Sequence, residues 1–454
     1  MTQRTRRRTR REPATAADVE RGVRQLLADK VSGTMAGVWL LAPEHLRLGT
    51  FDLLCAWLDR PGAQVQPRLA LQVMHEAALC LTGVRRAQGA LSQKGFELAN
   101  GLPFVATDQA LHDLFAPIPI QRTQGFQVAL GLMRRAGGHF QGDLLAIDPH
   151  HLRSFTKRQT RRHRHKETEE AVKTVQTFFC FDVQTQQPVA FTLGSSSRTV
   201  SQGAPELLAL ARDILQPRPG QTLVLADNEH LTADLFAHVA EQTPFDLLAP
   251  MPRGLPQQER LARLPHALFA PRWAGFATAR QPYRFAQRPD LDLLQIIQRG
   301  GETPDAYHYT PFLATTDQRD DLDLLLRDFP RRWRLEEFFN DYQAMGWNRA
   351  GTLNLNIRYA HLSLALAAQA SVHQLRQRLG PPYDRWEADH LAKHLLMGLD
   401  GDIRVHDDTI VVTFYNAPAA LRPHYEHLPA KLRAEGLNPR LPWLYDFQLD
   451  FRFR

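Results

Sequence analysis

The chain has 454 residues, enough for two to four domains with a large buried core, and its 43% hydrophobic and 23% charged residues are typical of a globular protein. A formal net charge of +7 and a pI of about 9.5 favour a polyanionic partner, most commonly nucleic acid, although a merely basic soluble protein stays open. Three cysteines without CxxC spacing argue against a disulfide framework or a cysteine zinc site. No apolar run is long enough to span a membrane. From these two features we expect a cytoplasmic protein.

The N-terminal segment MTQRTRRRTRRE carries six arginines within eight positions. No apolar segment follows these arginines, so we do not expect the segment to be a secretory signal. Because like charges repel, we expect residues 1–15 to form a disordered basic arm. Such an arm either lies along DNA phosphates or is only a solvated tail.

Residues 16–135 are predicted to form a helical domain. The patterns predict helices over 16–32 and 66–83, and a helix near Gln109 that Thr107 or Asp108 caps. Short helices with Gly and Pro between them suit a DNA-binding module, and they suit any small helical bundle equally well.

From about residue 140 the pattern changes to alternating strands and helices, which predicts an α/β fold. The predicted strands are 143–148, 175–183, 188–194, 221–227 and 245–250, and the predicted helices are 204–215 and 231–242. The second and third strands read as a hairpin. A hairpin followed by right-handed crossovers predicts a mixed sheet with helices on its faces.

The remainder of the chain is predicted as three further parts. Residues 251–328 read as a β-rich insertion with strands over 276–285, 292–299 and 307–316. Two helical stretches follow, over 331–346 and 353–377. The C-terminal region, 381–454, includes a predicted hairpin over 403–415, which turns at Asp407 and Asp408.

Two acids follow predicted strands of the α/β part. Asp148 ends the first strand and Asp227 ends the fourth. Ligands of open α/β sheets bind beyond the carboxyl ends of the strands, so neighbouring strands would place these carboxylates side by side. Carboxylates without thiols or clustered imidazoles favour Mg²⁺, with Mn²⁺ as an alternative. The competing interpretation of Asp227 is a plain helix N-cap.

A third acid lies in the segment FPRRWRLEEFFNDYQAMGW, residues 329–347. Arg332 and Glu336 are four residues apart and would share one helix face, either completing the carboxylate set or forming an ordinary ion pair. Glu337 is the nearest rival to Glu336. Rivals of lower rank are Asp143, Asp182 and Asp234; Asp182 fits a supporting role or plain turn chemistry.

A basic segment, RSFTKRQTRRHRHK, follows Asp148 directly. We predict that it contacts DNA phosphates beside the acidic site; a solvated charged face is the alternative. Its candidate DNA-binding residues are Arg153, Lys157, Arg158, Arg161, Arg162, Arg164 and Lys166.

The order of the strands, the two aspartates and the Phe-x2-Arg-x3-Glu helix resemble the DDE transposases of bacterial insertion sequences, IS-four type, over roughly residues 140–380. That group carries a Tyr-x2-Arg-x3-Glu-x6-Lys signature. Arg332 and Glu336 match it, while Phe329 and Gln343 depart from its Tyr and Lys. The spacings, 227 − 148 = 79 and 336 − 227 = 109 residues, are similar to those of the group.

The resemblance implies a ribonuclease-H-like catalytic domain over 140–250 and 329–380. It implies that Asp148, Asp227 and Glu336 are the catalytic residues and hold two metal ions, and that Arg332 binds a DNA phosphate. It further implies that the protein cuts and joins double-stranded DNA at terminal inverted repeats and target sites, as a homodimer at the bacterial nucleoid. The alternatives are a nuclease of the same fold without strand transfer and a catalytically retired DNA-binding protein.

Two lesser candidates complete the predicted site. Trp273 is a candidate for stacking on a flipped base at the DNA end, although a core tryptophan is the favoured interpretation. His230 is a candidate phosphate contact, although a surface histidine in a turn is favoured.

Overall fold

The computed structural model describes residues 15–33, 35–62, 64–82, 91, 93–154, 162–164, 170–195, 197–347 and 351–454. The chain divides into two compact units. The first combines Met1–Ile118, Ala344–Trp347 and Ala360–Arg454, and the second combines Pro119–Gln343 and Asn348–Tyr359. The predicted basic arm lies outside the described residues, except for Thr15.

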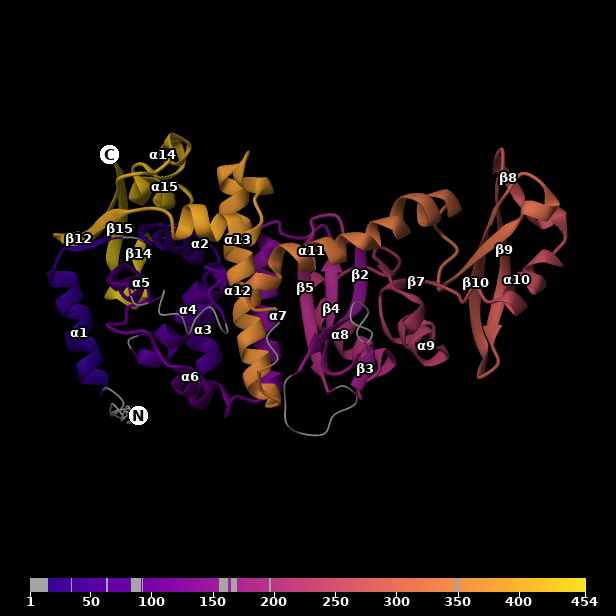
Figure 1. Ribbon diagram of the computed structural model, residues 1–454, viewed down its shortest axis with the longest axis horizontal. Helices are drawn as coiled ribbons and strands as arrows, with labels where there is room; N and C mark the ends of the chain where they lie inside the picture. Colours follow the sequence, from indigo (N-terminus) through magenta and orange to yellow (C-terminus); the bar gives the residue numbers. More distant parts are fainter. Residues whose placement is uncertain are drawn as a thin grey trace, which may run out of the picture. The chain divides into compact units, whose positions relative to one another are not determined.

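The first unit is mainly helical in its N-terminal part, as the sequence predicts (Figure 1). Its helices are α1 Ala16–Ala28, α2 Ala42–Arg47, α3 Thr50–Leu58, α4 Val65–Ala78, α5 Lys94–Ala99, α6 Asp108–Phe115, α12 Leu355–Leu379 from residue 360 onward, α13 Ala388–Leu391, α14 Arg422–Tyr425 and α15 Leu428–Ala434.

Local sequence explains where these helices begin and end. Thr15 and Asp18 form a reciprocal capping box that starts α1, and Thr107 accepts the backbone N–H of Ala110 at the start of α6, as predicted. The predicted 16–32 helix stops four residues early because the chain enters a strand. The predicted 66–83 helix also stops early, before Cys80, whose φ of 54° is left-handed.

The first unit also contains a five-stranded sheet in the described part of the chain, in the order β1-β12-β13-β15-β14. Its strands are β1 Val31–Gly33, β12 Gly401–His406, β13 Thr409–Phe414, β14 Arg440–Leu441 and β15 Phe447–Phe453. The predicted C-terminal hairpin is confirmed: β12 pairs antiparallel with β13, and Asp407 takes the left-handed conformation in the turn.

The second unit is built on strands and helices in alternation. Its elements are α7 Ile120–Ala136, β2 Leu144–Arg153, β3 Arg162–Arg164, β4 Ala171–Asp182, β5 Gln187–Gly194, α8 Val200–Leu215, β6 Leu223–Leu225, α9 Ala233–Gln242, β7 Asp246–Pro250, α10 Leu255–Ala262, β8 Ala270–Trp273, β9 Phe276–Phe285, β10 Arg288–Gly300, β11 His308–Ala314 and α11 Arg334–Tyr342. The sequence pattern places residues up to 135, and so nearly all of α7, in the N-terminal helical domain. In the structure α7 belongs instead to this second unit, where it packs against α8.

The centre of this unit is a mixed sheet with the strand order β5-β4-β2-β6-β7. Strands β5, β4 and β2 pair antiparallel, and β2, β6 and β7 pair parallel. This is the ribonuclease-H-like arrangement that the sequence predicts. The run of apolar residues in each strand follows from burial of the sheet on both faces.

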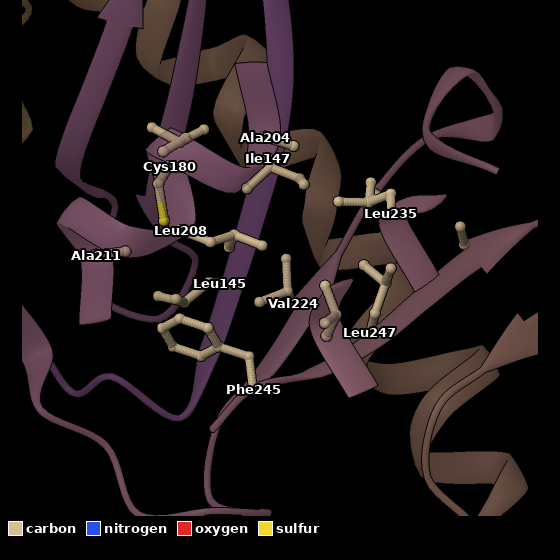
Figure 2. Close-up of a cluster of buried hydrophobic side chains, with 14 of the residues drawn as sticks. Leu145, Ile147, Cys180, Ala204, Leu208, Ala211, Val224, Leu235, Phe245 and Leu247 are labelled. Atoms are coloured by element: carbon tan, nitrogen blue, oxygen red, sulfur yellow. The ribbon is translucent and has the colours of Figure 1, made fainter. Parts of the chain in front are cut away.

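One face of the sheet packs against α8 and α9 (Figure 2). Leu145 and Ile147 of β2, Val224 of β6, Leu208 of α8 and Leu235 of α9 belong to one buried cluster there. Side chains of a strand alternate between faces, so Ala146 and Asp148 of β2 point to the opposite face, where α11 lies.

The strands predicted between residues 251 and 328 all form, and they extend the same sheet. Strand β11 pairs antiparallel with β7, and β10, β9 and β8 follow outward. Helix α10 covers this part through a small core that contains Leu261 and Phe269. No described helix is long and apolar enough to cross a membrane.

Candidate active site

Asp148 and Asp227 lie on neighbouring strands, as predicted. Strand β2 pairs parallel with β6, and the last parallel pair is Ala146 with Leu225. Asp148 and Asp227 are each two residues beyond that pair, so both point to the face that α11 covers. Each side chain is about one-fifth exposed, at 20% for Asp148 and 24% for Asp227.

The prediction that Asp148 ends its strand is wrong. Strand β2 continues to Arg153, and Asp148 pairs with Phe179 of β4. The polar residues after Asp148 gave no strand signal because their pairing partner, the start of β4, lies far along the chain. Asp148 is therefore held rigidly within an antiparallel ladder at the point where the parallel pairing ends.

Asp227 is the N-cap of a short 3-10 helix, Asn228–His230, and accepts the backbone N–H of Glu229 over 3.1 Å. The capping interpretation is thus confirmed. One oxygen, Oδ1, receives both this N–H and the imidazole of His230, which leaves Oδ2 without either contact. A cap and a metal ligand are compatible roles for a carboxylate with two oxygens.

The interpretation of His230 as a surface histidine is wrong. His230 is 1% exposed, and its Nδ1 lies 2.6 Å from Oδ1 of Asp227. The carboxylate can only accept, so the imidazole donates. The spacing of three residues between Asp227 and His230 was a visible signal for this contact, but burial of a polar turn residue depends on the surrounding fold.

Arg332 reaches the same site from the 3-10 turn Phe329–Trp333, and its Nη1 lies 3.8 Å from Oδ2 of Asp148. The predicted 331–346 helix is interrupted: the 3-10 turn contains Pro330, α11 begins at Arg334, and a second 3-10 turn starts at Gln343. Arg332 and Glu336 therefore do not share the face of one regular α-helix.

Aromatic contacts hold α11 on the sheet. Phe339 stacks on His150 of β2 at 4.3 Å and packs edge-on against Phe179, and Phe338 meets Phe181. Glu336 is half-buried on this helix, whereas Glu337 is exposed. The charge of Glu336 also contributes to raising the pKa of Asp148, so Glu336 is the acid that faces the site.

The two aspartates have opposite electrostatic environments. Burial, followed by the charge of Asp227, raises the pKa of Asp148 to about 7, and Arg332 only partly opposes this rise. Burial alone would raise the pKa of Asp227 as well. The hydrogen bond and charge of His230, together with Arg332, instead lower the pKa of Asp227 below its ordinary value. The pair therefore combines Asp148, whose pKa is raised, with Asp227, whose pKa is lowered and which is ionised at neutral pH.

Asp148, Asp227 and Glu336 do not form a finished metal site among the described residues. In the described part of the chain, no three His, Cys, Asp or Glu side chains are close enough together to hold a metal ion. The oxygen-only donors and the repulsion between Asp148 and Asp227 nevertheless fit a hard divalent cation, which would relieve that repulsion.

The rival acids have other positions. Asp182 is fully buried and accepts four backbone N–H groups, from Gln141, Gly142, Gln184 and Thr185. Its role is therefore to stabilise the backbone of these turns. Asp234 lies in the first turn of α9. Asp143 precedes β2, at the end of the strand remote from Asp148.

The predicted basic loop is partly strand. Arg153 is exposed at the end of β2, and Arg162 is exposed in β3, which pairs with β4 and also includes Arg164. Lys157, Arg158, Arg161 and Lys166 lie outside the described residues. Arg153 lies five residues beyond Asp148 on the same strand, so its side chain points to the opposite face of the sheet, and its contact with DNA stays a prediction.

Trp273 is not a core tryptophan, so the favoured interpretation is wrong. It ends the outermost strand, β8, with 52% of its surface exposed. Its ring stacks on Phe276 with centroids 4.3 Å apart and an interplanar angle of 8°. Burial could not be read from the sequence because the segment APRW gives no alternation that marks a face.

Comparison with known proteins gives one family. Residues 139–369 match the family described as "Transposase DDE domain". Among solved structures, a cryo-EM structure of a piggyBac transposase synaptic complex with hairpin DNA matches at 10% identity and a TM-score of 0.43, over 82% of each chain. No curated protein matches the chain.

Proposed function

The chain belongs to the transposases with a DDE domain, and we propose that it binds the ends of an IS-four-type insertion sequence, cuts the DNA there and joins it to a target. The observation that carries the proposal is the placement of Asp148 and Asp227, each two residues beyond the last parallel pair of β2 and β6. These two acids and Glu336 are the proposed catalytic residues, and a homodimer on double-stranded DNA is the proposed assembly.

Asp148, Asp227 and Glu336 would hold the metal ions, with Mg²⁺ the preferred ion and Mn²⁺ the alternative. Bound metal supplies an activated water or 3′-hydroxyl and stabilises the leaving oxygen of the phosphodiester. His230 fixes one oxygen of Asp227 and keeps that carboxylate ionised. Glu336 would be the third carboxylate ligand.

Arg332 supplies the positive charge of the site. Its guanidinium now neutralises Asp148 from 3.8 Å, and bound cations would release it to pair with a DNA phosphate. Phe329 and Gln343 replace the Tyr and Lys of the IS-four signature, so Arg332 carries the phosphate contact without those two partners. Arg153 and the other cations of the 153–166 segment are the proposed contacts to the flanking backbone.

The test is cleavage of DNA that carries the boundaries of the gene's own genomic locus. Wild-type protein is incubated with Mg²⁺ or with EDTA, beside the Asp227→Asn variant. We expect metal-dependent nicking at the boundary that disappears in the variant while DNA binding persists. Binding without cleavage by the wild type would leave only the DNA-binding alternative.

A second assay separates the transposase from a nuclease of the same fold. Pre-cut boundary DNA with a free 3′-hydroxyl is mixed with a supercoiled plasmid and Mg²⁺. A transposase joins the two molecules, whereas a nuclease without strand transfer cuts the boundary DNA and yields no joined product.

A further inference from the structure

A polar pocket lies at the end of the central sheet opposite to Asp148 and Asp227. Asp143, Leu144 and Gln221 line it from the amino ends of β2 and β6, and Gln184 lines it from the turn between β4 and β5. The pocket has a volume of about 500 Å³. The other wall is formed by three arginines, Arg319, Arg327 and Arg331, together with Asp328.

The lining of this pocket carries more arginines than carboxylates, three against two. Arg327 is already paired: it bonds Asp328 and Asp323, each over 2.9 Å. Arg319 and Arg331 then face a single lining carboxylate, Asp143, while Asp323, which bonds Arg327, does not itself line the pocket. Asp246, the next carboxylate near Arg319, does not line the pocket.

Two of the pocket's cations have unused donors. Arg319 donates from Nη2 to the backbone oxygen of Gln221 over 2.9 Å, but its Nε is buried and has no acceptor. Arg331 has no hydrogen bond or ion pair from its side chain to any described residue. Buried guanidinium N–H groups without acceptors are stabilised by an anion with several oxygens, such as a phosphate.

The pocket is linked to the candidate active site through one short turn. Arg331 and Arg332 are adjacent in the 3-10 turn Phe329–Trp333; Arg331 lines the pocket, while Arg332 lies near Asp148. Asp143 and Asp148 are five residues apart along the chain, about 16 Å at roughly 3.3 Å per residue. A stacked DNA strand covers that distance in about five nucleotides.

We propose that this arginine pocket binds a phosphate of the DNA backbone about five nucleotides from the phosphodiester that is cut at Asp148 and Asp227. The assignment of the cut site rests on the proposed function. Arg319 and Arg331 make the contact, and Arg327 holds the wall in place through its two acids. The contact reads no sequence; it fixes the path of the strand leaving the acidic site.

The test is DNA binding in EDTA, so that it does not depend on cleavage. A labelled duplex from the gene's boundary is titrated by fluorescence anisotropy at several salt concentrations. The variants are Arg319→Gln, Arg331→Gln and the double variant. The matched control is Arg212→Gln, which removes the same charge from an exposed site on α8. Thermal melts confirm that each variant is folded.

We expect each pocket variant to weaken binding about fivefold and to reduce the salt slope by roughly one, with Arg212→Gln close to wild type. Neutral methylphosphonate groups placed one at a time along the strand should weaken wild-type binding near the predicted position. The same substitution should have no effect on the double variant. Equal weakening by Arg212→Gln, or no sensitive position, would overturn the proposal.

A parallel titration with inorganic phosphate identifies the source of the anion. Phosphate binding that the double variant abolishes, with unchanged DNA binding, would make the pocket a site for a free anion and refute the DNA contact. A position-specific DNA effect without any metal-dependent cleavage would support the pocket while rejecting the enzyme, so the two proposals fail separately.

Discussion

At the scale of single residues, Asp227 shows how a structural and a chemical role can coexist. Its Oδ1 accepts both the Glu229 N–H and the His230 imidazole, and these two contacts fix the carboxylate plane. The other oxygen, Oδ2, takes part in neither contact. The local cap is therefore compatible with the proposed role of Asp227 as a metal ligand.

His230 should support metal binding through Asp227. Replacing it with Ala removes the hydrogen bond that orients the carboxylate, and we expect Mn²⁺ affinity to fall about tenfold. His230→Gln keeps an N–H donor and should lose less. Isothermal titration with Mn²⁺ measures both, with Asp227→Asn as the baseline; wild-type affinity in His230→Ala would contradict the role.

Asp182 is expected to contribute to stability and not to chemistry. Asp182→Ala removes a buried carboxylate and leaves four backbone N–H groups, in residues 141–142 and 184–185, without their acceptor; we expect a loss of about 3 kcal/mol in unfolding free energy. Urea unfolding measures the loss. Mn²⁺ binding by the folded fraction should stay at the wild-type level, and a selective loss of metal binding would reverse this assignment.

At the scale of elements, α11 decides which of two adjacent glutamates faces the acids. Phe338 and Phe339 anchor one side of the helix on the sheet, which leaves Glu336 half-buried and Glu337 in solvent. We expect Glu336→Gln to abolish metal-dependent DNA cleavage and Glu337→Gln to retain at least half of the wild-type rate. The two variants differ by one position and carry the same charge change, so each is the control for the other. Loss of cleavage in Glu337→Gln but not in Glu336→Gln would make Glu337 the catalytic acid.

The elements also show which parts of the fold the sequence could predict. Buried apolar runs such as residues 221–227 and 245–250 identified strands β6 and β7, because their signal is local. The extension of β2 through His150 to Arg153 depends on pairing with residues 174–179, and no local pattern marks it. The same holds for His230, whose burial depends on the fold around its turn, and for the 3-10 turn that separates Arg332 from α11.

At the scale of the whole molecule, composition and charge pointed to nucleic acid before any site was considered. The domain boundaries were harder to predict. Strand β1 pairs with β12, Val31 opposite Ile403, so the first unit is assembled from the two ends of the chain. Pairing between residues so far apart leaves no trace in local composition. The places of Asp148 and Asp227 beside neighbouring strands could be predicted because each acid follows a local apolar run.

The first unit should make the protein sensitive to acid. His45 and His75 are fully buried, with their Nε2 atoms 3.0 Å apart. Burial lowers the pKa of His75 to about 4 and that of His45 well below its ordinary value. Unfolded histidines bind protons near pH 6.5, so the neutral folded pair contributes stability above that pH and loses it progressively as the pH falls toward 4.

We expect the unfolding free energy of the first unit to fall by about 2 kcal/mol or more between pH 7 and pH 5, from a His75 pKa shift of this size. Tryptophan fluorescence during urea unfolding isolates this unit, because Trp39 and Trp443 are buried in it whereas the described tryptophans of the second unit, Trp273 and Trp333, are exposed. His75→Gln cannot take up a proton, so its stability should depend less steeply on pH even if it is lower at pH 7. A variant as acid-sensitive as the wild type would show that other groups cause the loss.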